Sequence, residues 1–164
     1  MTNREHNIIY ADVLIAAKST EELCALPVAG LSAKDCVLFL WVAFPRLPDA
    51  LKVIEAWGFQ YKTVAFVLNK RSRRPADWQW GMKYWTQPNA QLCLLATKGT
   101  PSKCVQQMID GSCEYSRKPN EIREKIVEVM GDLPRIELFP REKADGWDIF
   151  GNEVIPNIAL APGS

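Results

Sequence analysis

The stretch Cys36-Val37-Leu38-Phe39-Leu40-Trp41-Val42 is apolar at every position, and it decides the fold class. A strand with one solvated face alternates apolar and polar residues. An unbroken apolar run of this length is typical of a central strand covered on both faces. Such strands occur mostly in parallel sheets that have helices on both sides. The run therefore predicts an α/β protein.

The segments on either side of this run alternate between strand and helix patterns. Apolar runs predict further strands at Asn7–Ala11, Phe59–Leu68, Ala90–Thr97 and Arg135–Phe139. Helical spacing and capping signals predict a short helix that begins at the Ser19-Thr20-Glu21-Glu22 capping box, a second over Leu47–Trp57 before Gly58, and a third over about Asn120–Met130 before Gly131. The expected fold is an open, mostly parallel sheet of Rossmann type with helices on both faces.

Length and composition limit the organisation and the partners of the chain. Its 164 residues, 48% of them hydrophobic, predict a single domain over residues 1–154 and a loose tail over 155–164. The net charge of +1 means that any contact with nucleic acid is local. No apolar run reaches the roughly 20 residues that span a bilayer, and the first residues are polar, so a cytoplasmic protein without a membrane contact is expected.

The cysteine and histidine content argues against a metal site. The five cysteines show no C-x-x-C pairing, and His6 is the single histidine. Two of the cysteines, Cys36 and Cys93, lie inside apolar strand patterns. Reduced, buried thiols in a cytosolic protein are the expected state.

One segment between predicted strands combines cations with aromatic rings. Such alternation is typical of nucleic-acid surfaces, where cations contact phosphates and rings stack on bases. The alternative is a solvated basic turn followed by tryptophans that close the core, and the sequence does not separate the two. The candidate nucleic-acid-binding residues are Lys70, Arg71, Arg73, Arg74, Trp78, Trp80 and Trp85.

The last predicted strand and the turn after it suggest a small-molecule site. The strand carries Glu137 and is followed by Arg141, and a later glycine turn carries Asn152 and Glu153. Acceptors and a cation are thereby expected at one edge of the sheet. Two alternatives stay open: Glu137 and Arg141 pair with each other at the surface, or Gly151-Asn152 is an ordinary tight turn.

An ordered series of motifs runs from about Asn7 to Val154. It comprises I-I-Y-A-D, V-L-F-L-W-V, G-F-x-Y-K-T-V-A-F-V, W-G-M-x-Y-W-T-x-x-N-A-Q-L-C-L-L-A-T-K-G, S-R-K-P-N-E-I-R-E-K-I-V-E, R-I-E-L-F-x-R and G-W-x-x-x-G-N-E. This series resembles the MT-A70 family of S-adenosylmethionine-dependent adenine methyltransferases. The family includes mRNA adenosine methylases and many bacterial and phage DNA enzymes.

The resemblance implies a Rossmann-like methyltransferase sheet with its motifs in permuted order. It also implies methyl transfer to the exocyclic amine of adenine, in DNA rather than RNA. By the family's pattern Asp12 is the catalytic carboxylate, and Lys118 meets the carboxylate of S-adenosylmethionine. The same pattern assigns Glu137 and Arg141 to the ribose, and Asn152 and Glu153 to the ribose or adenine edges.

The chain departs from the family directly after Asp12. The family has D-P-P-W there, with an aromatic ring that stacks on the base, whereas this chain has Val13-Leu14-Ile15. Three explanations compete: a natural inactive relative, a base pocket rebuilt with Trp78, Trp80 or Trp85, or an incomplete version of an active parent. The alternative function is an inactive relative that binds nucleic acid or a partner subunit as a scaffold. The sequence does not predict the oligomeric state.

Overall fold

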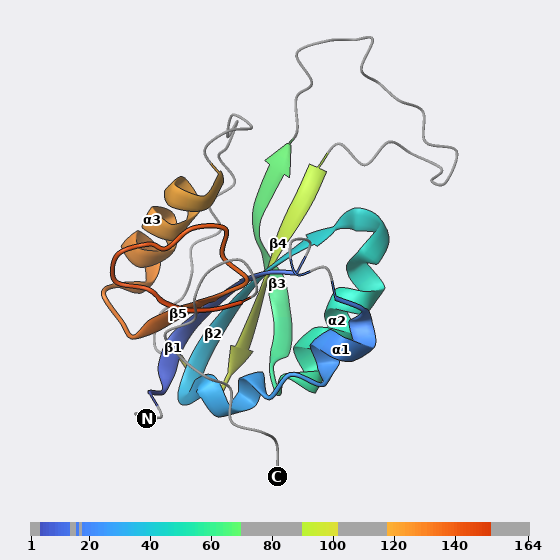
Figure 1. Cartoon of the computed structure of the whole chain (residues 1–164), viewed down its shortest axis with the longest axis horizontal. Coiled ribbons are helices and arrows are strands. Elements are labelled where there is room, and N and C mark those ends of the chain that lie inside the picture. Colours follow the sequence, from blue (N-terminus) through green and yellow to red (C-terminus); the bar gives the residue numbers. More distant parts are fainter. Residues whose placement is uncertain (1–3, 14–15, 17, 70–89, 102–117, 152–164) are drawn as a thin grey trace.

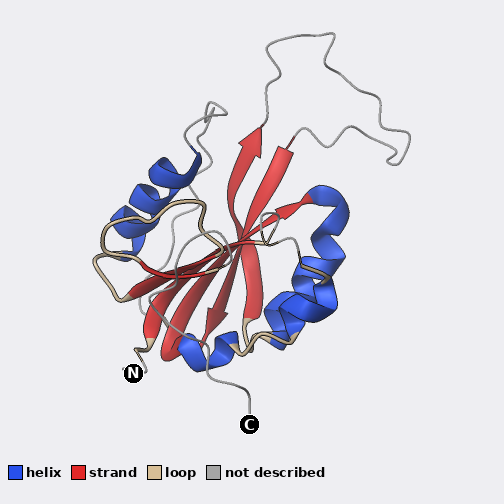
Figure 2. Ribbon diagram, viewed as in Figure 1, coloured by secondary structure: helices blue, strands red, loops and turns tan. Residues whose placement is uncertain are grey.

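The computed structural model describes residues 4–13, 16, 18–69, 90–101 and 118–151. Its elements follow the predicted alternation, with short 3-10 turns η1 and η2 before and after the central strand. Figure 1 and Figure 2 show them as one sheet flanked by helices. In chain order they are β1 (His6–Asp12), α1 (Thr20–Cys24), η1 (Val28–Leu31), β2 (Ser32–Ala43), η2 (Phe44–Arg46), α2 (Leu47–Ala56), β3 (Gln60–Asn69), β4 (Ala90–Lys98), α3 (Lys118–Met130), β5 (Arg135–Leu138) and β6 (Asp148–Phe150).

The six-stranded sheet has the order β3-β4-β2-β1-β5-β6. Strand β1 pairs in parallel with β2 and β5, and β5 pairs in parallel with β6. Strand β4 pairs antiparallel with both β2 and β3. Because β4 alone runs against the others, the sheet is mostly parallel, as predicted. The apolar run Cys36–Val42 lies in β2, with β1 on one side and β4 on the other.

Helices cover both faces of the sheet, which confirms the predicted architecture (Figure 1). Side chains of a strand point alternately to its two faces. On β1, Ile9 and Ala11 pack in one core with residues of α1 and α2, whereas Ile8 and Tyr10 pack in a second core with residues of α3. We call these the α1/α2 face and the α3 face of the sheet.

The helix ends form as their sequence signals predict. The Ser19 hydroxyl accepts from the backbone N–H of Glu22 at 3.2 Å, and the Glu22 carboxylate accepts from the backbone N–H of Ser19 at 2.7 Å. Gly58, after α2, has a φ of +81°, a conformation that glycine adopts without strain. Trp57 donates from its indole to the carbonyl of Leu23 at 2.7 Å, which fastens α2 to α1.

Most predicted strand bounds shift by one residue, and β2 begins at Ser32, four residues before the apolar run; the start of α3 and strand β6 also differ from the prediction. Helix α3 begins at Lys118, two residues earlier than expected, because Pro119 suits the first turn of a helix. The sequence pattern does not predict β6, since three residues are too short to show an alternation. His6 ties this strand to β1: its ring contacts the Asp148 carboxylate at 2.7 Å and the Leu31 carbonyl at 3.1 Å. None of the helices in the described residues is long and apolar enough to cross a bilayer.

Candidate active site

The carboxyl ends of four parallel strands meet at one edge of the sheet. Asp12 at the end of β1 is in register with Trp41 of β2, and its neighbour Ala11 is in register with Leu138 of β5. Leu138 is in turn in register with Phe150 of β6. In open α/β sheets, ligands bind outside this edge of the strands. We therefore take it as the candidate active site.

Asp12 lies on the α3 face and is buried, with 8% of its surface exposed. Strand alternation places it on the same face as Tyr10, whose hydroxyl accepts a hydrogen bond from the Trp41 indole at 2.8 Å. Val13, the first residue of the altered motif, is partly buried and packs against the core of the α1/α2 face. Residues 14, 15 and 17 lie outside the described residues. An inactive relative, a rebuilt base pocket and an incomplete version of an active parent all stay open as explanations of the altered motif.

Glu137 is buried on the α3 face of β5, in register with Tyr10. Its carboxylate accepts from Nε of Arg123 on α3 at 2.6 Å, and both side chains are almost wholly buried. This pairing corrects one alternative from the sequence: Glu137 pairs with Arg123 in the interior, not with Arg141 at the surface. A carboxylate has about four acceptor positions on two oxygens, so one guanidinium N–H leaves acceptor capacity for a ligand hydroxyl.

The electrostatics of Glu137 and Tyr10 reflect their burial. Burial raises the pKa of the Glu137 carboxyl above its ordinary value. The hydrogen bond and charge of Arg123 act in the opposite direction, and the charges of Asp12 and Glu142 raise it further. Burial also raises the pKa of Tyr10 well above its ordinary value, and the charges of Cys93, Glu137 and Asp12 add to this effect. The charge of Asp12 on β1 therefore acts on the Glu137 carboxyl of the neighbouring strand β5.

The chain approaches itself closely just after β5 and β6, at this edge of the sheet. The N–H of Phe139 donates to the carbonyl of Phe150 at 2.6 Å, and Phe139 has a φ of +62°, which non-glycine residues rarely adopt. A Cβ atom on Gly151 would lie 2.6 Å from Cα and 2.9 Å from N of Phe139. Gly151 has no positive φ, so close approach of two backbones, rather than turn geometry, requires glycine here. The alternative of a tight turn assumed that Gly151 tolerates a positive φ, and Gly151 does not use one; Asn152 lies outside the described residues.

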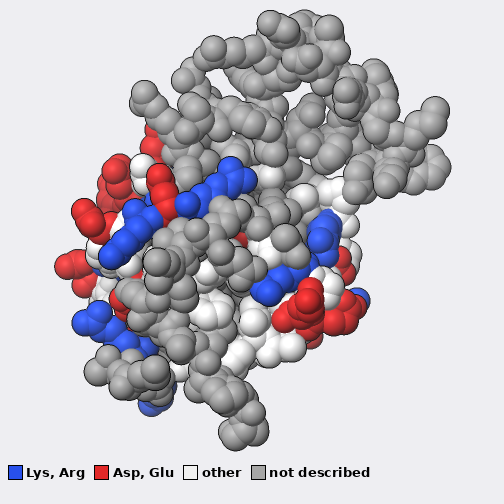
Figure 3. Space-filling view, viewed as in Figure 1, with Lys and Arg blue, Asp and Glu red and all other residues white. Residues whose placement is uncertain are grey.

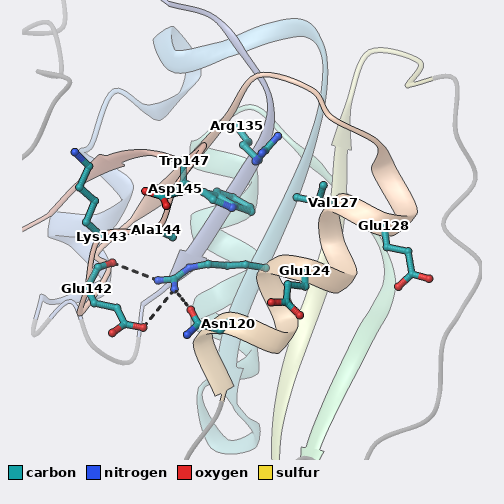
Figure 4. A pocket seen from close by; sticks show the side chains of 11 residues that line it. Asn120, Glu124, Val127, Glu128, Arg135, Glu142, Lys143, Ala144, Asp145 and Trp147 are labelled. Carbon is teal, nitrogen blue, oxygen red and sulfur yellow. Dashed lines mark hydrogen bonds and ion pairs between the residues drawn. The ribbon is translucent and has the colours of Figure 1, made fainter.

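A cleft of about 690 Å³ opens between α3 and the segment that joins β5 to β6. Figure 4 shows Asn120 on the helix side and Glu142 on the opposite side, both joined by dashed lines to one guanidinium. That group belongs to Arg123, which contacts the Asn120 side chain at 2.8 Å and the Glu142 carbonyl at 3.4 Å. Acidic and basic side chains are interspersed on the visible surface around this helix (Figure 3). The cleft thus has a mixed charge, with Arg123 reaching from its wall to Glu137.

The structure describes some of the predicted site residues and leaves others out. Asp12 and Glu137 lie on one face of neighbouring strands, and Arg141 is exposed just beyond β5. Lys118 is the first residue of α3, but its side chain lies outside the description. The remaining candidates all lie outside the described residues: Asn152 and Glu153, and the basic and aromatic segment with Lys70, Arg71, Arg73, Arg74, Trp78, Trp80 and Trp85.

Three residues of this site were not predicted from the sequence: Arg123, Tyr10 and Trp41. A signal for Arg123 is present, because it precedes Ile126 and Met130 by helical spacing and so lies on the buried stripe of α3. A charged residue on such a stripe requires a buried partner. In the part of the chain that is described, no group of three or more His, Cys, Asp or Glu side chains is placed to hold a metal ion.

Comparison with known proteins gives consistent matches. Residues 2–153 match the sequence model of the MT-A70 family. The chain is 34% identical over 143 residues to the Type II methyltransferase M.MunI of a Mycoplasma species, across 84% of this chain and 58% of that protein. It is 27% identical over 158 residues to the N(6)-adenosine-methyltransferase MT-A70-like protein of Arabidopsis thaliana, across 89% of this chain and 22% of that protein. A probable N(6)-adenosine-methyltransferase MT-A70-like protein of Oryza sativa subsp. japonica gives 27% identity over 158 residues, across 21% of its length.

Proposed function

The chain belongs to the MT-A70 family, and on this premise we propose that it transfers a methyl group from S-adenosylmethionine to the exocyclic amine of adenine in nucleic acid. The chain spans 58% of the length of M.MunI and 22% of the Arabidopsis protein. The activity is therefore proposed for this chain rather than transferred from those longer proteins.

The observation that carries the proposal is the buried carboxylate of Asp12 at the carboxyl edge of the sheet, with Glu137 on the same face of the next strand. The amine of adenine is a poor nucleophile because its lone pair is delocalised into the ring. An acceptor held rigidly against an amine N–H orients the nitrogen and favours its reactive, tetrahedral shape. Asp12 is the residue to which we assign this role.

The donors and acceptors at this edge fit S-adenosylmethionine, which supplies the methyl group on a sulfonium when it is bound. Glu137 retains acceptor capacity for ribose hydroxyls, and Arg141 adds a guanidinium beside the same strand end. Gly151, which packs closely on the Phe139 backbone, directly precedes Asn152 and Glu153 in the sequence. We assign Lys118 to the methionine carboxylate, Glu137 and Arg141 to the ribose, and Asn152 and Glu153 to ribose or adenine.

We propose DNA as the nucleic acid. The support is the higher identity to the bacterial relative, 34%, compared with 27% for the Arabidopsis N(6)-adenosine-methyltransferase. The segment with Lys70, Arg71, Arg73, Arg74, Trp78, Trp80 and Trp85 is the proposed contact surface, in which cations bind phosphates and rings stack on bases.

A second function is favoured by one specific observation. Val13-Leu14-Ile15 stands where the family has two prolines and an aromatic ring, so the stacking partner for adenine is missing from its usual place. A relative that binds nucleic acid or a partner subunit without methylating adenine accounts for this sequence. The two functions differ in turnover, and the scaffold does not require the cofactor.

The test measures binding and turnover separately. The protein is titrated with S-adenosylmethionine in a calorimeter and then incubated with adenine-containing duplex DNA and S-adenosylmethionine that carries a tritiated methyl group. We expect micromolar binding and transfer of label to DNA, with transfer lost in Asp12→Ala and binding retained. Binding without transfer identifies the scaffold. Absence of binding contradicts the methyltransferase and agrees with a scaffold that acts without the cofactor.

A further inference from the structure

Arg123 makes several polar contacts besides its ion pair with Glu137. Its Nε lies 2.6 Å from Oε2 of Glu137, and its Nη1 lies 2.8 Å from Oδ1 of Asn120. Its Nη2 lies 3.4 Å from the backbone carbonyl of Glu142, whose carboxylate is 3.6 Å from Nη1. The residue is 3% exposed, so these contacts are made almost without water. All three nitrogens of the guanidinium are in use.

These contacts join three segments that carry proposed cofactor ligands. Arg123 lies on α3, the helix that begins at Lys118. It holds Glu137 on β5 and the backbone of Glu142, the residue next to Arg141. One guanidinium therefore fixes the positions of a helix, a strand and the segment after that strand relative to one another. Lysine has a single terminal nitrogen and cannot reproduce this planar, three-way geometry.

We propose that Arg123 is the positioning residue of the cofactor site: it orients the Glu137 carboxylate toward the ribose and keeps it negatively charged. This role rests on the function proposed above. Arg123 itself does not touch the cofactor; it acts through Glu137.

The surroundings of Glu137 explain why such a residue is needed. Among the described residues, the titratable or charged groups that act on its carboxyl are Arg123 from α3, Asp12 and Tyr10 from β1, and Glu142 from the segment after β5. Burial and the two neighbouring carboxylates raise the pKa of Glu137, and the hydrogen bond and charge of Arg123 oppose this. Without Arg123 the carboxyl takes up a proton at a higher pH, and a protonated carboxyl is a poorer acceptor for two ribose hydroxyls.

The test is the pH dependence of cofactor binding. S-adenosylhomocysteine, the product of methyl transfer, is titrated calorimetrically between pH 6 and pH 9 with the wild type, Arg123→Gln and Arg123→Lys. In the wild type, affinity falls as the pH falls through the protonation of Glu137. We expect this fall to occur at higher pH in Arg123→Gln, so that its affinity is weaker than that of the wild type by about tenfold at the lower end of this range and closest to it at pH 9. Arg123→Lys keeps the charge, so its profile should lie closer to the wild type.

Two controls separate positioning from general damage. Arg135→Gln removes another arginine of the same cleft, one that contacts Asp132 and not Glu137, and should keep the wild-type profile. Glu137→Gln and the double variant Arg123→Gln/Glu137→Gln should both bind weakly without the pH dependence, and equally so. Circular dichroism and thermal melts establish which variants are folded. If Arg123→Gln does not fold, Glu137→Gln and the double variant decide the question.

The outcomes distinguish this role from the proposed function. Absence of wild-type binding at every pH overturns the cofactor site and this role together. Wild-type binding combined with an unchanged pH profile in Arg123→Gln overturns the role of Arg123 alone. Where Arg123→Gln does not fold, a double variant that binds more weakly than Glu137→Gln overturns it. A uniform loss of affinity at all pH values in Arg123→Gln also overturns it, because that is the result of a purely structural residue.

Discussion

The two faces of the sheet are built from different residues, although the same strands supply both. On the α1/α2 face, Ile9 and Ala11 of β1 pack with Leu38 and Leu40 of β2 and with Ile54 of α2 in an apolar core. On the α3 face, the same two strands present Tyr10, Asp12 and Trp41, and β5 adds Glu137. Strand alternation separates an apolar core from a buried polar cluster only one residue away.

This difference indicates which face carries the chemistry. Apolar burial stabilises a fold at about 25 cal/mol for each Å² removed from water, whereas a buried ion pair often contributes little or costs stability. The pair of Arg123 with Glu137, and the carboxylate of Asp12 nearby, are therefore weak evidence for a stabilising role. Their position at the carboxyl edge of parallel strands favours a functional one.

The largest expected effect comes from breaking the buried pair on one side only. Arg123→Met leaves the Glu137 carboxylate buried without its charged partner, and we expect a loss of about 3–5 kcal/mol in the free energy of unfolding. Arg123→Met/Glu137→Leu removes both charges and should regain most of that stability while cofactor binding is lost. Urea denaturation measures the first quantity and calorimetry the second.

The control for this pair lies on the other face. Ile54→Val shortens a buried side chain of α2 and should cost about 0.5–1.5 kcal/mol without changing cofactor affinity. A double variant that stays as unstable as Arg123→Met would show that the pair is chiefly structural. The contrast between the two faces would then lose its functional meaning.

An intermediate effect is expected at Gly151, where β5 and β6 meet. Alanine there brings a Cβ to 2.6 Å from the Phe139 Cα atom, and relieving such overpacking costs about 1–3 kcal/mol. Because the shift moves the chain just before Asn152, affinity for S-adenosylhomocysteine should fall as well. Gly30→Ala is the matched control, since no atom lies within 4 Å of its added Cβ. Equal behaviour of the two variants in urea denaturation would contradict the close approach.

The α1/α2 face is the side of the molecule that sequence patterns predict best. The Ser19 capping box and the spacing from Leu47 to Trp57 belong to this face, and the apolar run of β2 supplies every second residue to it. These are local signals, and the structure confirms each of them. Each signal has a physical cause that acts within a few residues. Burial on both faces explains the β2 run, satisfied N–H groups explain the capping box, and a single apolar stripe explains the spacing in α2. A local pattern is sufficient to reveal a local cause.

The α3 face is predicted less well because its contacts join distant segments. Arg123 and Glu137 are 14 residues apart, and no spacing rule connects a helix position to a particular residue of the following strand. The resemblance to the MT-A70 family draws attention to Glu137 but not to Arg123, which lies inside a quoted motif without an assigned role. Gly151 shows the same limit. Its sequence context suggests a turn, whereas the reason that glycine is needed there is the close backbone of Phe139.

The smallest expected effect tests the locally encoded side of the molecule. Ser19→Ala removes the hydroxyl that accepts from the Glu22 N–H, and loss of such a cap typically costs about 1 kcal/mol. Ser19→Thr keeps a hydroxyl and should remain close to the wild type in urea denaturation. Since α1 has five residues and packs on the α1/α2 face, affinity for S-adenosylhomocysteine should not change in either variant. A loss of affinity in Ser19→Ala would mean that the segment after Asp12 transmits strain to the active edge, and the two faces would no longer be independent.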